Sequence, residues 1–119
     1  MFQLIDGGLS TQLELQGVDL KKFPKTWTAG LLESPSGCAD LRRAHASYID
    51  AGADIILTSS YQTSLDTEKV ILQKSVALTV EAANIEATKG GGLAKVYLSL
   101  GPWGATQADG SEYTGKVSF

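Results

Sequence analysis

Short apolar runs alternate with segments of helical periodicity along this chain, and that alternation limits the folds it can form. Runs at residues 2–5, 54–58 and 95–100 are rich in aliphatic and β-branched residues, which is typical of strands. The segments between them carry apolar residues at helical spacing and end at glycines. Strands that alternate with helices form a parallel sheet with the helices outside it. The sequence therefore predicts an α/β fold in the order β-α-β-α-β, followed by a loop.

Capping residues predict where the first helices begin and end. Ser10–Gln16 is expected to be a short helix, because Thr11 and Glu14 have capping-box spacing and Gly17 is placed to end it. A second helix is expected to begin at Ser34-Pro35, where serine caps and proline loses no hydrogen bond.

Two further helix boundaries depend on glycine. Gly52 is expected to end the second helix, and the triple glycine at 90–92 a third helix over 67–89. Asp66 and Glu68 lie near the positive end of that third helix. The residues expected on its packed face are Val70, Ala77, Val80 and Ala83.

The pattern fits either a small doubly wound sheet or the start of a (β/α) barrel. Three strands cannot close a barrel, and a closed eight-stranded one takes about 250 residues. In a barrel, residues 1–119 are therefore a single partial domain of about three βα units.

Composition narrows the possible partners. The formal charge is −3, the isoelectric point is near 5.0, and no run of Lys or Arg occurs, which disfavours nucleic acid and anionic membrane surfaces. No unbroken apolar stretch of secretory or membrane-spanning length is present, so a cytoplasmic protein is expected. Cys38 and His45 are the single cysteine and histidine, so no metal site of Cys/His type is expected. Cys38 is expected to be a small buried or half-buried residue, and His45 a surface or interhelix residue.

Asp6-Gly7-Gly8 follows the first apolar run and so lies at the carboxyl end of a predicted strand. In α/β enzymes the catalytic and binding residues lie at the carboxyl ends of the strands. Glycine permits close approach of a ligand to the backbone, and the helix that follows offers free N–H groups. A carboxylate beside such donors suits a zwitterion such as an amino acid. The alternative is a tight turn, since these are common turn residues.

A polar loop over residues 59–64 follows the second apolar run. Carboxyl ends of parallel strands meet at one edge of a sheet, so this loop and Asp6 are expected to converge.

Four stretches in order resemble the N-terminal part of the zinc-dependent homocysteine S-methyltransferases. They are Ile5 to Gly8, Trp27, the block Ala51 to Gln62, and Gly101 to Gly104 with Asp109 to Tyr113. The resemblance implies a (β/α)8 TIM-type barrel with homocysteine and a sulfonium methyl donor as partners. The donor is S-methylmethionine or S-adenosylmethionine, the product is methionine, and zinc holds the homocysteine sulfur as a thiolate.

The resemblance also implies a substrate site. Asp6 with its two glycines holds the amino-acid end of homocysteine, Trp27 offers a cation–π face to the sulfonium, and the loop at Glu112 covers the site. The full set implied is Asp6, Gly7, Gly8, Trp27, Ser59, Ser60, Tyr61 and Glu112.

The chain departs from the family in its metal ligands. Three cysteines from later barrel strands bind zinc in the family, and none of them is present here, so the chain alone is expected to be inactive. After Gly115 the family continues, whereas this chain ends with Lys116–Phe119, which predicts a truncation, a splice form or a gene-model error.

Two other functions remain open. A partial barrel exposes a sheet edge, which predicts a marginally stable or oligomeric chain and a non-catalytic module that associates with itself or with a full-length relative. A flavodoxin-like nucleotide binder is disfavoured, because the spaced glycines of the dinucleotide fingerprint and the P-loop pattern are both missing.

Overall fold

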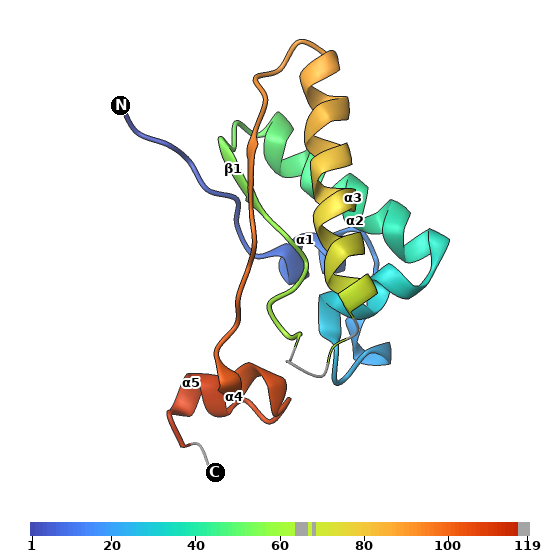
Figure 1. The fold of residues 1–119 in the computed structure, drawn as a ribbon, viewed down its shortest axis with the longest axis vertical. Helices are drawn as coiled ribbons and strands as arrows, with labels where there is room; N and C mark the ends of the chain where they lie inside the picture. Colours follow the sequence, from blue (N-terminus) through green and yellow to red (C-terminus); the bar gives the residue numbers. More distant parts are fainter. Residues whose placement is uncertain (64–66, 68, 117–119) are drawn as a thin grey trace.

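The computed structural model describes residues 1–63, 67 and 69–116. The predicted positions at Ser64, Asp66, Glu68 and the last three residues lie outside the described residues. The elements, shown in Figure 1, are α1 (Leu9–Leu15), the 3-10 helices η1 (Leu20–Lys22) and η2 (Trp27–Glu33), α2 (Pro35–Asp50), β1 (Ile55–Leu57), α3 (Lys69–Thr88), β2 (Lys95–Tyr97), α4 (Trp103–Thr106) and α5 (Ser111–Thr114).

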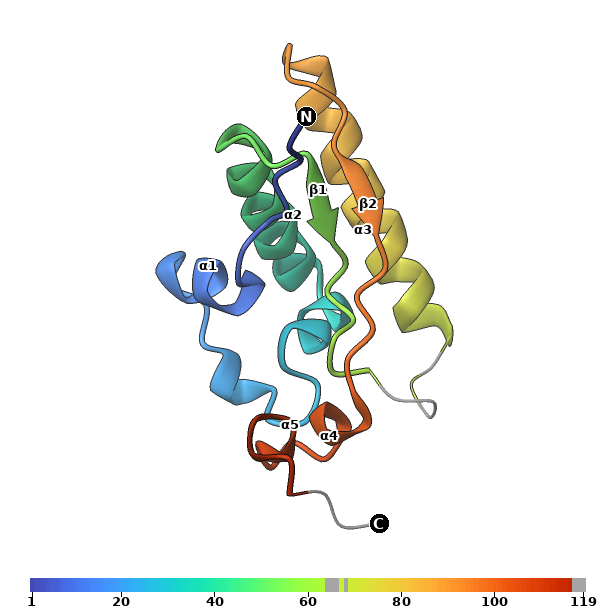
Figure 2. The same ribbon diagram turned by 90° about the vertical axis from the view of Figure 1, so that its left-hand side faces the viewer.

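Two parallel strands form the sheet, as the alternating pattern predicts. The strands β1 and β2 pair with Ile55 opposite Lys95 and Leu57 opposite Tyr97. The helices α2 and α3 cover one face of this sheet, and the strands point toward α4 and α5 (Figure 2). The α/β class is confirmed, and the small parallel sheet fits part of a barrel.

The first predicted strand is shorter than expected, because only Ile5 forms a bridge, parallel to Ile55. The Leu4 carbonyl accepts from the N–H groups of both Asp54 and Ile55, at 2.8 and 3.0 Å. The Leu4 N–H donates to the Asp54 carboxylate at 2.8 Å. A side chain thus replaces a backbone acceptor, which stops the ladder before it extends toward residue 2.

The N-terminus of α1 differs from the prediction in its cap. Gly8 is the N-cap, without a side-chain hydrogen bond, and the helix begins at Leu9 rather than Ser10. The predicted capping box at Thr11 and Glu14 was therefore wrong, because both residues already lie inside the helix. The terminating role of Gly17 is confirmed by its φ of +86°, a conformation that glycine adopts without steric cost.

The N-cap of α2 is confirmed. Ser34 Oγ accepts from the Gly37 N–H at 3.0 Å, and Pro35 occupies the first turn. Gly52, with a φ of +102°, follows the end of the helix as predicted.

The packed face of α3 was predicted wrongly. Val70, Ala77 and Val80 are exposed, and of the predicted set only Ala83 is buried. The buried residues of α3 are Ser75, Leu78, Thr79, Ala82, Ala83 and Glu86. This face includes the hydroxyl groups of Ser75 and Thr79, which are buried because they have hydrogen-bond partners in the core. The spacing of apolar residues cannot reveal such partners.

The segment after β2 is more regular than the predicted loop, since it contains the single-turn helices α4 and α5. The Asp109 carboxylate accepts from the Ser111 N–H at 2.9 Å and thereby fixes the turn that begins α5. Gly110 and Gly115 flank α5 with positive φ.

The larger part of the core lies between α1, the 3-10 helices, α2 and α3. Its buried members are Leu13, Leu20, Leu31, Leu32, Cys38, Leu41, Ala44 and Leu78. Cys38 is a small buried residue, as predicted. Among the described residues, no helix is long and apolar enough to span a membrane.

His45 lies fully buried between α2 and α3, which confirms the interhelix placement. Its Nε2 lies 3.3 Å from Thr79 Oγ1, and its Nδ1 is buried without a partner. Burial lowers the pKa of His45 from 6.5 to about 4, because the charged ring loses its hydration.

This burial predicts a pH dependence of stability. The unfolded chain protonates His45 near pH 6.5 and the folded chain only near pH 4. The folded state therefore loses about 3 kcal/mol of stability from this group as the pH falls across that window. Urea unfolding at pH 7 and pH 4 measures this loss in the parent and in a His45→Gln variant, whose side chain does not titrate. Between the two pH values, the unfolding free energy of the variant is expected to fall by about 3 kcal/mol less than that of the parent. Equal losses in parent and variant would contradict the prediction.

Candidate functional site

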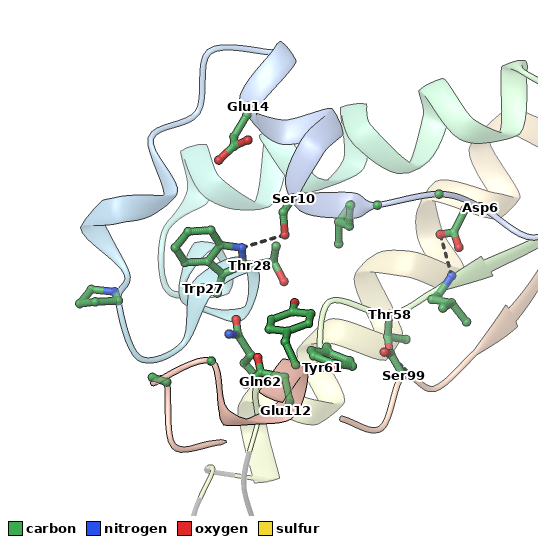
Figure 3. Close-up of a pocket in the computed structure, with 18 residues that line it drawn as sticks. Asp6, Ser10, Glu14, Trp27, Thr28, Thr58, Tyr61, Gln62, Ser99 and Glu112 are labelled. Atoms are coloured by element: carbon green, nitrogen blue, oxygen red, sulfur yellow. Dashed lines mark hydrogen bonds between the residues drawn. The ribbon is translucent and has the colours of Figure 1, made fainter. Parts of the chain in front are cut away.

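A cavity of about 590 Å³ opens at the carboxyl edge of the sheet. Asp6, Thr58 and Ser99, which follow the Ile5 bridge, β1 and β2 respectively, all line it. Figure 3 shows Asp6, Thr58 and Ser99 on one side, Trp27 on the other, and Tyr61 and Gln62 between them. The predicted convergence of the strand-exit loops is present in the structure.

Asp6 has one satisfied and one unsatisfied carboxylate oxygen. Its Oδ2 accepts from the Leu57 N–H at 2.9 Å, whereas its Oδ1 is buried without a partner. Burial raises the pKa of Asp6 above 3.8, and the Leu57 hydrogen bond opposes that shift. The ionised carboxylate therefore has an unmet requirement for a positive group or a donor.

Tyr48 of α2 holds the turn that follows Asp6. Its hydroxyl donates to the Gly8 carbonyl at 2.9 Å. A Cβ atom at Gly7 would lie 3.0 Å from that hydroxyl oxygen, so glycine allows the close packing. Burial, and then the negative charge of Asp6, raise the pKa of Tyr48 and keep its phenol protonated.

Trp27 forms part of the opposite wall. Its Nε1–H donates to Ser10 Oγ at 2.8 Å, which fixes the indole ring across from α1. The backbone of Trp27 has a φ of +47°, an uncommon conformation for a residue with a side chain. Such strain is frequent at binding sites, where the surrounding structure holds it in place.

The charge of the cavity is negative. Asp6, Glu14 and Glu112 line it, and no Lys or Arg is found among its described lining residues. Glu112 Oε2 is buried without a hydrogen-bond partner. The aromatic residues Trp27 and Tyr61 also line this cavity. Carboxylates and aromatic faces together favour a ligand with a positive charge.

Two of the predicted site residues lie behind the cavity wall. Ser59 Oγ lies 3.1 Å from Ser75 Oγ of α3, and Ser60 Oγ donates to the Ser99 carbonyl at 2.8 Å. Both serines are buried, and neither lines the cavity. The structure brings together the other members of the predicted set, which are Asp6, Gly7, Gly8, Trp27, Tyr61 and Glu112.

Sequence reasoning missed several lining residues. Thr58 and Ser99 lie near the carboxyl ends of the apolar runs 54–58 and 95–100, and that position is the signal that could have identified them. Glu14 lies in α1 and had been assigned only to a helix cap. Within the described ranges, no group of three or more His, Cys, Asp or Glu residues could hold a metal ion. Cys38 and His45 both lie in the core instead.

Comparison with known proteins identifies relatives. The family model described as homocysteine S-methyltransferase matches residues 3–119. Homocysteine S-methyltransferase 1 from Brassica oleracea var. italica is 38% identical over 131 residues, which covers 95% of this chain and 39% of the relative. Selenocysteine Se-methyltransferase from the same plant is 36% identical over 135 residues, with 96% and 38% covered.

A solved structure shares the fold. The crystal structure of the homocysteine methyltransferase MmuM from Escherichia coli, in its metallated form, matches with a TM-score of 0.82 and 31% identity. The match covers 100% of this chain and 44% of that chain. The chain thus spans well under half the length of the relatives it matches. Because the family match extends over nearly every residue, the chain belongs to the homocysteine S-methyltransferase family.

Proposed function

We propose that this chain supplies the amino-acid pocket of a homocysteine S-methyltransferase. That enzyme transfers a methyl group from a sulfonium donor, S-methylmethionine or S-adenosylmethionine, to homocysteine and yields methionine. The observation that carries the proposal is the negative, aromatic cavity at the carboxyl edge of the sheet, which has no cation among its described lining residues. Both substrates carry an ammonium group, and the donor carries a second positive charge on sulfur.

Asp6 binds the ammonium group of the amino-acid substrate in this proposal. Its Oδ1 has no partner, and an ammonium donor would satisfy that oxygen. Binding would also lower the pKa of Asp6, because a positive neighbour favours the ionised form. Gly7 and Gly8 line the cavity beside this carboxylate.

Trp27 and Tyr61 receive the sulfonium group. A cation within about 6 Å of an aromatic centroid is attracted to the face of the ring. The indole N–H is bound to Ser10, which fixes the ring at the cavity that Trp27 lines. Glu112 lies at the same cavity and adds negative charge. In the transfer step, the new bond joins the homocysteine sulfur to the methyl carbon, and the donor leaves as a neutral thioether.

Zinc is the metal that the family resemblance implies. The described residues do not fit it, because Cys38 donates to the Leu32 carbonyl inside the core and His45 contacts Thr79 between two helices. We therefore assign substrate positioning to this chain and no metal ligation.

Ligand binding tests the proposal directly. S-methylmethionine is expected to change the fluorescence of Trp27, measured in a Trp103→Phe background that removes the second indole. Methionine lacks the second methyl group on sulfur and the positive charge that comes with it, so it is expected to bind about tenfold more weakly. Trp27→Phe removes the signal, so calorimetry is used to measure the weaker affinity of that variant. Equal affinity for the two ligands would overturn the sulfonium assignment.

A methyl-transfer assay tests the metal assignment separately. With homocysteine, zinc and each sulfonium donor in turn, the 119-residue chain alone is expected to form no methionine. Turnover would show that these residues complete a metal site after all.

Asp6→Asn is expected to raise the stability of the folded chain at pH 7 and to lower its affinity for S-methylmethionine. Burial raises the pKa of Asp6, so its stabilising contribution is complete below pH 3.8 and is lost as the pH rises through the folded value. At pH 7 the Asp6→Asn variant should therefore unfold at higher urea concentration than the parent, and at pH 3 this difference should shrink. The same variant should bind S-methylmethionine more weakly.

Asp109→Asn is the matched control for stability. The Ser111 hydrogen bond lowers the pKa of Asp109, so this variant should lose stability at pH 7. Two variants that shift in the same direction would contradict the electrostatic explanation.

A second function, as a self-associating module, is favoured by the exposed edge of β2. Lys95 and Tyr97 direct their backbone groups to β1, so those of Val96 point to the other side, which no described strand covers. Beside it lies an apolar groove of about 1140 Å³, formed by α3 residues together with Leu98 and Leu100. We propose that a second copy of the chain covers this edge.

Leu100→Lys is expected to weaken that association. Leu100 is 77% exposed at the groove, so a charge there should make the sedimentation coefficient independent of protein concentration. Leu15→Lys is the control, because Leu15 is 78% exposed on α1 and does not line the groove. A parent chain that remains monomeric at all concentrations, or equal effects of the two variants, would contradict the proposal.

A further inference from the structure

Side chains continue the connection between β1 and β2 beyond the end of the backbone ladder. The last backbone hydrogen bond runs from the Thr58 N–H to the Tyr97 carbonyl at 3.1 Å. Beyond it, the Ser99 N–H donates to Thr58 Oγ1 at 2.9 Å, and Ser60 Oγ donates to the Ser99 carbonyl at 2.8 Å. Thr58 Oγ1 and Ser60 Oγ lie 2.7 Å apart. Both backbone groups of Ser99 are thus bound by hydroxyls from the β1 exit.

The direction of each hydrogen bond follows from the number of protons. Ser60 has one hydroxyl proton and gives it to the Ser99 carbonyl, which has none to offer. The proton between the two hydroxyls must therefore come from Thr58. Thr58 in turn accepts from the Ser99 N–H. The four groups form a closed ring with a single donor direction, from Ser99 N–H through Thr58 and Ser60 back to the Ser99 carbonyl.

The two residues that supply the hydroxyls of this ring are shielded from water, whereas Ser99 is half-buried. Thr58 is 3% exposed and Ser60 is 1% exposed. A buried polar group that loses its partner keeps the cost of its desolvation, so each member holds the others in place. The ring therefore fixes the two strand exits relative to each other more firmly than isolated surface hydrogen bonds would.

The exits that the ring fixes form part of the cavity wall. Thr58 and Ser99 line the cavity, and Tyr61 directly follows Ser60. The two exits are also packed closely, since a Cβ atom at Gly101 would lie 1.8 Å from the Tyr61 carbonyl oxygen. A shift of the β2 exit would therefore displace the Tyr61 backbone.

We propose that Thr58 and Ser60 are positioning residues, which hold Tyr61 and the Ser99 backbone in the geometry that receives the sulfonium ligand. The ligand class rests on the proposed function, whereas the ring itself does not. Ser60 thus acts from behind the wall, through the ring, without contact to the ligand.

Ser59 provides a matched control beside Ser60. Each serine is 1% exposed and uses its hydroxyl in a hydrogen bond to another segment of the chain. Ser59 binds Ser75 of the helix α3, however, and takes no part in the ring. Ser59→Ala and Ser60→Ala should therefore lower stability to a similar degree and differ in their effect on binding.

The first test measures S-methylmethionine affinity by the fluorescence of Trp27 in four variants of the 119-residue chain carrying Trp103→Phe. Thr58→Val and Ser60→Ala are expected to weaken binding about tenfold, since each breaks the ring. Thr58→Ser keeps the hydroxyl and should restore affinity to within about twofold of the parent, as should Ser59→Ala. Equal losses in Ser59→Ala and Ser60→Ala, or no loss in Thr58→Val, would overturn the positioning role.

The second test is amide hydrogen exchange at Ser99, which needs no ligand. The Ser99 amide should exchange slowly in the parent and in Thr58→Ser, and faster in Thr58→Val. A parent chain with a protected Ser99 amide that binds no sulfonium ligand would refute the proposed function and leave the ring intact. A parent that binds the ligand but exchanges Ser99 rapidly would refute the ring.

Discussion

The pairing of β1 on both of its edges is the interaction on which the rest of the structure depends. Ile55 bridges Ile5 on one side and pairs with Lys95 on the other, and Ile56 is fully buried against the helices. This arrangement brings three chain segments, far apart in sequence, to end at one edge of the sheet. The cavity residues Asp6, Thr58 and Ser99 are neighbours for this reason. Without β1 between them, the segment at Ile5 and the strand β2 would not belong to one sheet.

The alternation of strands and helices along the chain, and the glycines that end α1 and α2, could be predicted from the sequence because local chemistry determines them. Gly17 and Gly52 adopt positive φ where the helices end, and Ser34 caps α2. The face of α3 could not be predicted in the same way. Ser75 and Thr79 are buried because Ser59 and His45, which are distant in sequence, meet their hydroxyls. Apolar periodicity detects only faces that are buried because they carry apolar side chains. It therefore misses a helix face whose hydroxyl groups are buried and hydrogen-bonded.

The candidate site shows the same division. Asp6 and its glycines could be identified from their place after an apolar run, since that place alone sets them at the sheet edge. The serines after β1 could not be assigned from sequence spacing, because two adjacent residues in a connection bind different parts of the fold. Ser59 binds α3, while Ser60 joins the β2 exit. Which serine supports the cavity wall from behind depends on partners 16 and 39 residues away.

Carboxylate oxygens without hydrogen-bond partners and exposed apolar side chains lie on different surfaces of the chain. The unpartnered oxygens of Asp6 and Glu112 belong to residues that line the cavity, where a small cation would satisfy them. Exposed apolar groups such as Leu98 and Leu100 line the groove beside α3, where only another polypeptide would cover a comparable area. Because no described residue lines both sites, binding of a ligand in the cavity leaves the groove open. The ligand binding and the association that we propose are therefore compatible in one chain, and a substitution in the groove leaves the charge of the cavity unchanged.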